Sequence, residues 1–223
     1  IIPGLVGSEM CIRDSIYLIE LSIGCICICL GQYSSHILRA EDMTRQLRVM
    51  GICGTYTLES ANGRMLEIIS DKLKRRGIDW VVWDNKKYPL PFVGEEGCWN
   101  HPNVIKYKEL ADSADAFVLS SPEYHGTMSG VMKNSLDWLS FDQTSGKIFA
   151  FISTLGGQSN TTTLNHMRVV ARWIHGFSIP EQLVIAKVKT AFDENGDIVD
   201  EDIKNRIDKF TDSIIKHTEK FRE

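Results

Sequence analysis

Three polar turns, each placed after an apolar run, carry the residues of this chain whose types suit ligand chemistry. The first spans residues 53–62 and is rich in threonine and serine, immediately before a helical pattern. Hydroxyl groups at such a position, together with the N–H groups and dipole of a helix N-terminus, bind phosphate. The P-loop pattern GxxxxGK(S/T) is absent, so no lysine is required. Ser60 could equally be an ordinary helix N-cap, and one residue can fill both roles.

The second turn reads SPEYHG at residues 121–126, and the third is centred on Gly156 and Gly157. Two glycines let the main chain approach a planar ligand closely, although such a pair by itself is also an ordinary turn. The second turn alone could be a proline-containing turn in which Tyr124 packs. The sequence shows no His, Cys or Asp cluster with metal-ligand spacing and no GxSxG nucleophile pattern. The first turn therefore suits a phosphate, and the third suits a planar ligand.

The elements that must position these turns alternate between strand and helix. We expect buried strands at residues 47–52, 78–84, 116–121, 147–154 and 182–188, and helices at 62–76, 102–113, 131–139, 161–175 and after Asp200. This alternation predicts a parallel sheet with helices on both faces. The carboxyl ends of its strands share one edge, which is where open α/β sheets bind ligands.

The second turn and the helix after it carry a family resemblance. SPEYHG followed by SGVMKNSLDWLS resembles the SPEYNG…PGVLKNAIDW signature of the NADPH-dependent FMN reductase family, which are flavodoxin-like flavoproteins. His125 stands where the family has Asn. The first turn resembles the family's GSxRxxSxN phosphate loop, with Thr55, Ser60 and Asn62 at matching positions and Thr57 in place of the Arg. The third resembles a Gly-Gly turn that approaches the pyrimidine edge of the flavin.

The resemblance implies a flavodoxin-like α/β fold, a five-stranded parallel sheet in the order 2-1-3-4-5. It implies an FMN site formed by Thr55, Thr57, Ser60, Asn62, Pro122, Glu123, Tyr124, His125, Gly126, Ser153, Gly156 and Gly157. It also implies an NAD(P)H oxidoreductase that passes hydride from NADPH through FMN to a quinone, flavin or azo acceptor in a ping-pong cycle. No catalytic side chain is expected, and Glu123 is interpreted as structural.

Two other functions stay open at this stage. A flavodoxin-like electron carrier without NAD(P)H activity is one, although such carriers are strongly acidic and the net charge here is only −4. A flavin-binding protein without enzyme activity is the other, because Thr57 removes a cation from the loop. Arg64, one turn into the helix, could compensate for that cation, although a helical position points its side chain elsewhere.

Several residues outside the turns can be interpreted in two ways. Arg168 and Arg172 share a helix face, which we interpret as a solvated or interface surface rather than a nicotinamide-nucleotide phosphate site. In the long loop 85–101, Tyr88 and Trp99 either wall the flavin site or pack onto the body, and packing is favoured. The resemblance implies a homodimer or homotetramer, with the Asp-Trp pair near the interface. Trp138 matches that pair, or simply flanks the core.

Composition sets the remaining limits. With 43% hydrophobic residues and no basic excess, the chain is typical of a globular protein and not of a general nucleic-acid binder. Residues 43–223 hold only two of the six cysteines, which suits a reducing, cytoplasmic compartment.

The apolar run at residues 16–30 is shorter than the ~20 residues that a membrane span needs. Residues 6–15 resemble a library-adaptor string, so we expect residues 1–42 to be a non-native or disordered extension and residues 43–223 to be the flavodoxin-like domain.

Overall fold

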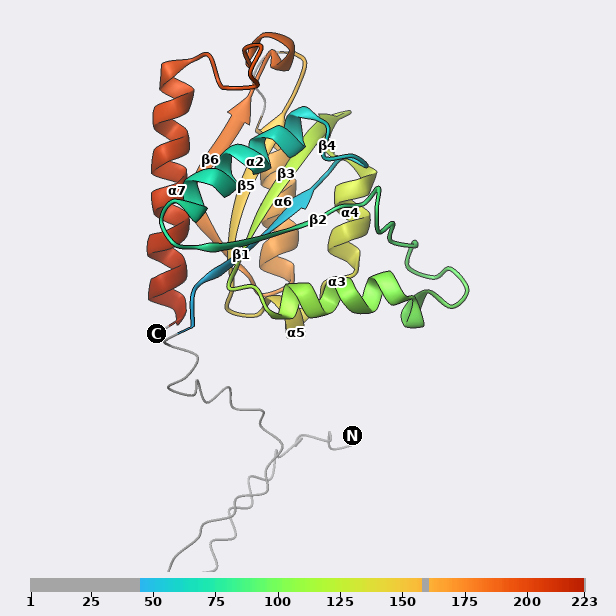
Figure 1. Ribbon diagram of the computed structural model, residues 1–223. Helices are drawn as coiled ribbons and strands as arrows, with labels where there is room; N and C mark the ends of the chain where they lie inside the picture. Colours follow the sequence, from blue (N-terminus) through green and yellow to red (C-terminus); the bar gives the residue numbers. More distant parts are fainter. Residues whose placement is uncertain (1–44, 158–160, 223) are drawn as a thin grey trace, which may run out of the picture. The chain divides into compact units, whose positions relative to one another are not determined.

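A computed structural model describes residues 45–157 and 161–222 of the chain. The expectation for residues 1–42 therefore lies outside the described residues. Five parallel strands form the sheet: β1 (Arg48–Cys53), β2 (Asp79–Trp83), β3 (Ala116–Tyr124), β5 (Ile148–Thr154) and β6 (Phe177–Ile185). Their order is β2-β1-β3-β5-β6, with the short strand β4 (Thr127–Met128) paired antiparallel to the end of β3. When the five parallel strands are numbered along the chain without β4, this order is 2-1-3-4-5, so the predicted order is confirmed (Figure 1).

Helices cover both faces of the sheet, as predicted (Figure 1). The long helices are α2 (Ala61–Lys74), α3 (Pro102–Asp112), α4 (Gly130–Asp137), α6 (Thr162–Trp173) and α7 (Glu201–Arg222); short ones are η1 (Cys98–Asn100), α5 (Phe141–Thr144) and η2 (Val188–Thr190). Helices α2 and α7 pack on one face, and α3, α4 and α6 pack on the other. Alternate residues along a strand point to opposite faces, so Phe117 and Val118 belong to different halves of the core.

The central strands are buried because they have neighbours on both sides and helices above and below. Every residue of β5 is buried, and β3 is buried from Ala116 to Pro122. Parallel strands that are covered on both faces have continuous apolar runs. In the sequence AFVLSSP the apolar run gives way to serines only near the carboxyl end of the strand. The polar residues of the second predicted turn therefore begin at the carboxyl end of a buried strand.

Two predicted boundaries are wrong. The last strand begins at Phe177 and ends at Ile185, rather than spanning 182–188. Its first residues are exposed and include Pro180, which an edge strand tolerates because one side of its backbone has no partner. Strand β3 also continues past the predicted end at Ser121, because Glu123 and Tyr124 pair with β4.

No helix among the residues that the structure describes is both long enough and apolar enough to cross a membrane. Among the same residues, no group of three or more His, Cys, Asp or Glu side chains could hold a metal ion. Both described cysteines, Cys53 and Cys98, are buried free thiols.

Candidate functional site

The three turns lie at the carboxyl edge of the sheet because β1, β3 and β5 are adjacent and parallel. The amide of Gly54 donates to the carbonyl of Ser120 at 2.7 Å, so the first loop starts against the end of β3. A Cβ on Gly54 would lie 2.8 Å from the Cα of Ser121. Only glycine allows the two segments to approach this closely.

Hydroxyl groups line the loop between β1 and α2. The Oγ1 of Thr55 lies 2.7 Å from the Oγ of Ser60 and donates to the carbonyl of Thr57 at 2.8 Å. Ser60 is also the N-cap of α2, since its Oγ accepts from the amide of Gly63 at 3.1 Å. Both roles considered for Ser60 therefore place its oxygen at the helix start. The Oγ1 of Thr57 accepts from the amide of Glu59, which closes a local turn.

The same loop presents several unpartnered main-chain donors. The N–H groups of residues 55–58 and of Ala61 and Asn62 donate to no acceptor among the residues that the structure describes. Two of these groups belong to the first turn of α2, where the helix itself supplies no acceptor. That first turn also carries no acidic residue. Free N–H groups and an uncompensated helix dipole give the loop a positive potential suited to an anion.

Two side chains of the first turn of α2 point away from this loop. Asn62 is buried, and its Oδ1 accepts from the hydroxyl of Ser120 at 3.1 Å, so its side chain joins the helix to β3. Arg64 donates to the carbonyl of Gly196 at 2.5 Å and forms an ion pair with Asp197. The suggestion that Arg64 replaces the cation missing at Thr57 is therefore wrong, because its guanidinium is bound to the loop before α7.

The second turn is a tight hairpin between β3 and β4. Its central residues, His125 and Gly126, have φ values of 53° and 78°. Two successive positive φ values define a type I′ turn, which favours Asn-Gly. The Asn of the family signature is thus explained by backbone conformation, and histidine is one of the few other residues enriched there. Tyr124 is 56% exposed beside this turn, so it does not pack in the core.

Two side-chain hydrogen bonds tie the hairpin to α6. The Oγ1 of Thr163 donates to the Oε2 of Glu123 at 3.0 Å. The Nδ1 of His166 lies 2.8 Å from the Oγ1 of Thr127. These contacts support the structural interpretation of Glu123.

The third turn offers open main chain and one buried hydroxyl. Gly156 and Gly157 are exposed, and a Cβ built on either would meet no atom of the described residues within 4 Å. The carbonyl of Gly157 accepts from the amide of Lys187 at 3.0 Å, which fixes the turn against the end of β6. The Oγ of Ser153 is buried below this turn without a hydrogen-bond partner among the described residues. Space above the glycines leaves this main chain accessible to a flat ligand.

The aromatic residues of the long loop pack onto the body, as we favoured. Tyr88 contacts the ring of Trp83 and lies under the Nζ of Lys106, 3.7 Å from the ring centroid. Trp99 packs edge-on against Trp138, which is buried and donates from its Nε1 to the carbonyl of Pro91. Trp138 therefore belongs to the core of the folded chain.

Arg168 is half-buried rather than fully solvated, which departs in part from our interpretation of this helix face as a solvated or interface surface. Its guanidinium donates to the carbonyl of Ile179 and to the side chain of Gln182, both at 3.0 Å, and lies 5.0 Å from the ring of Phe151. Burial lowers its pKa. The residue joins α6 to β6, whereas Arg172 is exposed.

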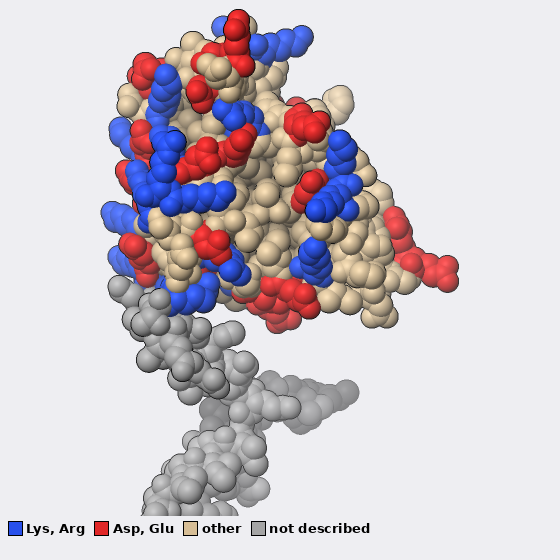
Figure 2. Space-filling model, viewed as in Figure 1, with Lys and Arg blue, Asp and Glu red and all other residues tan. Residues whose placement is uncertain are grey.

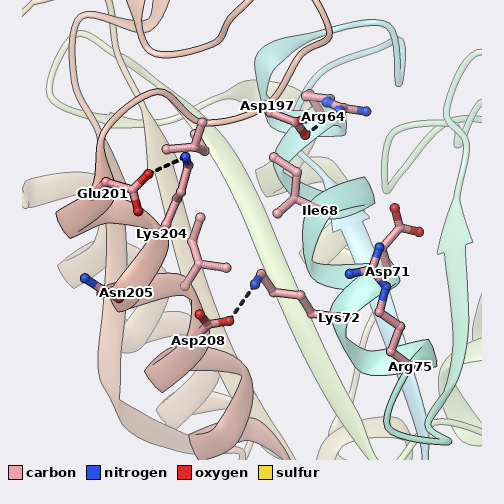
Figure 3. A pocket seen from close by; sticks show the side chains of 12 residues that line it. Arg64, Ile68, Asp71, Lys72, Arg75, Asp197, Glu201, Lys204, Asn205 and Asp208 are labelled. Carbon is pink, nitrogen blue, oxygen red and sulfur yellow. Dashed lines mark hydrogen bonds and ion pairs between the residues drawn. The ribbon is translucent and has the colours of Figure 1, made fainter.

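A groove of about 500 Å³ lies elsewhere, between α2 and α7 (Figure 3). Its charged side chains neutralise one another: Lys72 pairs with Asp208 at 2.5 Å, and Lys204 pairs with Glu201 at 2.6 Å. Figure 2 shows the same mixture of charges over α7 and α2. With no excess of either charge, this groove has the character of a solvated helix–helix contact.

Two serines that the sequence analysis did not single out are central to the site. Ser121 and Ser129 link the loop after β1 to the hairpin after β3 through buried hydrogen bonds. Ser129 is also the N-cap of α4, a role that a serine directly before an apolar helical pattern could have signalled.

Comparison with known proteins gives a consistent result. A family model described as NADPH-dependent FMN reductase matches residues 47–190. An NADPH-dependent FMN reductase, ArsH, of Rhizobium meliloti (strain 1021) is 30% identical over 186 residues, which cover 81% of this chain and 76% of that protein. An FMN-dependent NADPH-azoreductase of Staphylococcus aureus is 29% identical over 171 residues, covering 74% and 91% respectively.

Solved structures share the fold. FerB, a flavoenzyme NAD(P)H:(acceptor) oxidoreductase from Paracoccus denitrificans, superposes with a TM-score of 0.61 at 20% identity over 77% of this chain and 98% of that one. A flavodoxin from the domain Archaea superposes with a TM-score of 0.54 at 15% identity, covering 79% and 100%.

Proposed function

The chain belongs to the NADPH-dependent FMN reductase family, and on that premise we propose that its three turns form the FMN site. It is an oxidoreductase that uses FMN and NADPH. The observation that carries the proposed site is the loop of hydroxyls and free amides beside two exposed glycines and a tight hairpin, all at one edge of the sheet.

The proposed residues divide between the two ends of the cofactor. Thr55, Thr57, Ser60 and the amides of residues 55–58 and 61–62 would hold the phosphate. Hydroxyl and N–H donors with a helix dipole suit a phosphate without any basic side chain. Asn62 would contribute its main-chain N–H, because its side chain accepts a hydrogen bond from Ser120.

The flavin ring would lie between the hairpin, Pro122 to Gly126, and the turn of Gly156 and Gly157. The exposed ring of Tyr124 and the open glycine main chain supply flat, accessible surfaces. The unpartnered hydroxyl of Ser153 lies directly below and could bond a polar group that enters. When bound, FMN supplies the redox chemistry, and the protein orients it and tunes it.

We propose that the electron acceptor is a small aromatic molecule such as an azo compound, a quinone or a flavin. The relative from Staphylococcus aureus is named for azo reduction, and FerB for a general acceptor. An open edge with exposed aromatic and glycine surfaces suits a flat acceptor. An electron carrier without NADPH activity is not favoured, because the family is defined by NADPH-dependent reduction.

The test is an FMN titration followed by anaerobic addition of NADPH. We expect bound flavin absorbance to bleach with NADPH and to return when a quinone or azo dye is added. Thr55→Val, which replaces the hydroxyl by a methyl group of similar size, should weaken FMN binding about tenfold, corresponding to ~1.4 kcal/mol. Thr218→Val, at a buried hydroxyl bonded within α7, is the matched control and should bind like the wild type. Equal FMN affinity in both variants would contradict the proposed phosphate position.

We also propose that the chain forms a homodimer through an apolar patch on α5 and α6. Trp173 is 68% exposed, and Phe141 and Val169 lie near it around a groove of about 450 Å³. Exposed apolar patches of this kind mark interaction sites. Light scattering on Trp173→Glu should give the monomer mass, while the wild type gives twice that mass. An unchanged mass would place any interface elsewhere.

Two remaining expectations stay proposals. We propose a cytoplasmic location, which two buried free thiols suit. We propose that residues 43–223 suffice for function, which the family match to residues 47–190 supports. A chain beginning at Met43 should bind FMN with unchanged affinity, and a clear loss of binding would refute this.

A further inference from the structure

Ser129 joins three segments of the site through buried hydrogen bonds. The residue is 2% exposed at the start of α4. Its N–H donates to the Oγ of Ser121 at 3.1 Å. Its own Oγ donates to the carbonyl of Gly54 at 2.5 Å and accepts from the amide of Met132 at 3.0 Å. One residue thus connects the loop after β1 and the first turn of α4 through its side chain, and the end of β3 through its main-chain N–H.

The partners of Ser129 stand immediately before the two parts of the site. Gly54 precedes Thr55, and its amide is held by the carbonyl of Ser120 while its carbonyl is held by Ser129. Ser121 precedes Pro122, and its hydroxyl donates to the Pro122 carbonyl while accepting from Ser129. A shift at either junction would therefore carry the adjoining turn with it.

We propose that Ser129 is a positioning residue that fixes the phosphate loop, residues 55–60, relative to the hairpin, residues 122–126. The proposal rests on the proposed function, which assigns the phosphate to the loop and the flavin ring to the hairpin. Buried beneath both turns, Ser129 acts on FMN only through Gly54 and Ser121.

The relative position of loop and hairpin matters for phosphate affinity in this chain. Its loop carries Thr57 where the family signature has arginine, so the phosphate gains no side-chain cation. Affinity then depends on donors that already stand in place before the ligand arrives, since ordering them on binding costs free energy. The signature has proline at the position of Ser129, which offers neither an N–H nor a hydroxyl. The coupling is therefore a property of this chain.

Ser129→Pro removes all three hydrogen bonds without forcing the backbone. The φ of Ser129 is −64°, which proline adopts, and the preceding Met128 lies in an extended strand, which proline favours before it. Ser129→Thr keeps the N–H and the hydroxyl and serves as the rescue variant. Asp200→Ala is the control for a lost N-cap, because Asp200 caps α7 by accepting from the amides of Asp202 and Ile203.

The experiment measures FMN affinity by fluorescence quenching and the visible circular dichroism of bound flavin in the full-length chain. Ser129→Pro should raise the FMN Kd about tenfold, or ~1.4 kcal/mol, and should alter the visible dichroism band. Ser129→Thr should restore both. Asp200→Ala should lower Tm and leave both readouts unchanged. Should the proline variant not fold, Ser129→Ala, which retains the N–H, should raise the Kd about threefold.

Three results would overturn the proposal: an FMN Kd within twofold of wild type in the Ser129 variants, an unchanged dichroism band, or an equal loss of affinity in Asp200→Ala. The Thr55→Val variant shows whether such a result refutes the positioning role of Ser129 or the proposed FMN site itself. If Thr55→Val weakens binding while the Ser129 variants do not, the site stands and the positioning role falls. If Thr55→Val binds like the wild type, the phosphate position itself is wrong.

Discussion

Thr57→Arg should tighten FMN binding, because it returns a cation to the loop that we propose binds phosphate with neutral groups alone. Among the described residues the Oγ1 of Thr57 bonds only the amide of Glu59, and losing its proposed contact to the phosphate costs about 1 kcal/mol at most. A charge-assisted hydrogen bond to phosphate contributes about 1.5–3 kcal/mol. The exposed Glu59, two residues away, competes for the new guanidinium with an ion pair of about 0–1 kcal/mol. The net gain is about 1–2 kcal/mol, a 5- to 30-fold lower Kd.

The assay is fluorescence titration of FMN at low and high salt. The gain should shrink as ionic strength rises, because salt screens a partly exposed ion pair. Thr57→Gln provides a long neutral side chain as the control and should not tighten binding. Equal affinity of Thr57→Arg and wild type at low salt, or an equal gain in Thr57→Gln, would refute the argument that the phosphate lies at this loop and lacks a cation.

Three further changes test other parts of the structure. His125→Asn should raise Tm by about 1–3 °C, because asparagine adopts the positive φ of a type I′ turn more readily; a lower Tm would contradict the turn assignment. Burial lowers the pKa of Lys147 to about 8, so between pH 8 and 10.5 the unfolded chain binds more protons and stability rises with pH. Denaturation at pH 7 and 9.5 should show wild type gaining about 2 kcal/mol relative to Lys147→Met, and parallel pH curves would be the opposing result. Arg64→Met should reduce the free energy of unfolding by about 1–2 kcal/mol with no change in FMN Kd, whereas weaker FMN binding would return Arg64 to the phosphate site.

The sequence predicted the architecture because the pattern is local. Apolar runs such as FVL before Ser120 and periodic helical faces specify buried strands and covering helices without knowledge of distant residues. The order of the strands came from the family resemblance, since periodicity does not choose among orders. The strand at Phe177 was placed too late because its exposed start, interrupted by Pro180, carries no apolar run.

The residues that were misread or not singled out have partners in other elements of the fold. Arg64 bonds a carbonyl 132 positions later, and Arg168 reaches Ile179 and Gln182 across a helix–strand turn. Ser129 reaches back 75 positions to Gly54. The hydrogen-bond partners of these side chains depend on how the elements pack, which local sequence patterns do not encode.

The unpartnered amides of the first loop also make it a natural reporter. Hydrogen exchange proceeds from groups that are not hydrogen-bonded, whereas the buried central strands open only with large parts of the fold. The amides of residues 55–58, 61 and 62 should therefore exchange with solvent deuterium much faster than those of β5. A phosphate that accepts from them would slow that exchange at one short peptide, so the occupancy of the site could be followed in a mixture without any flavin signal.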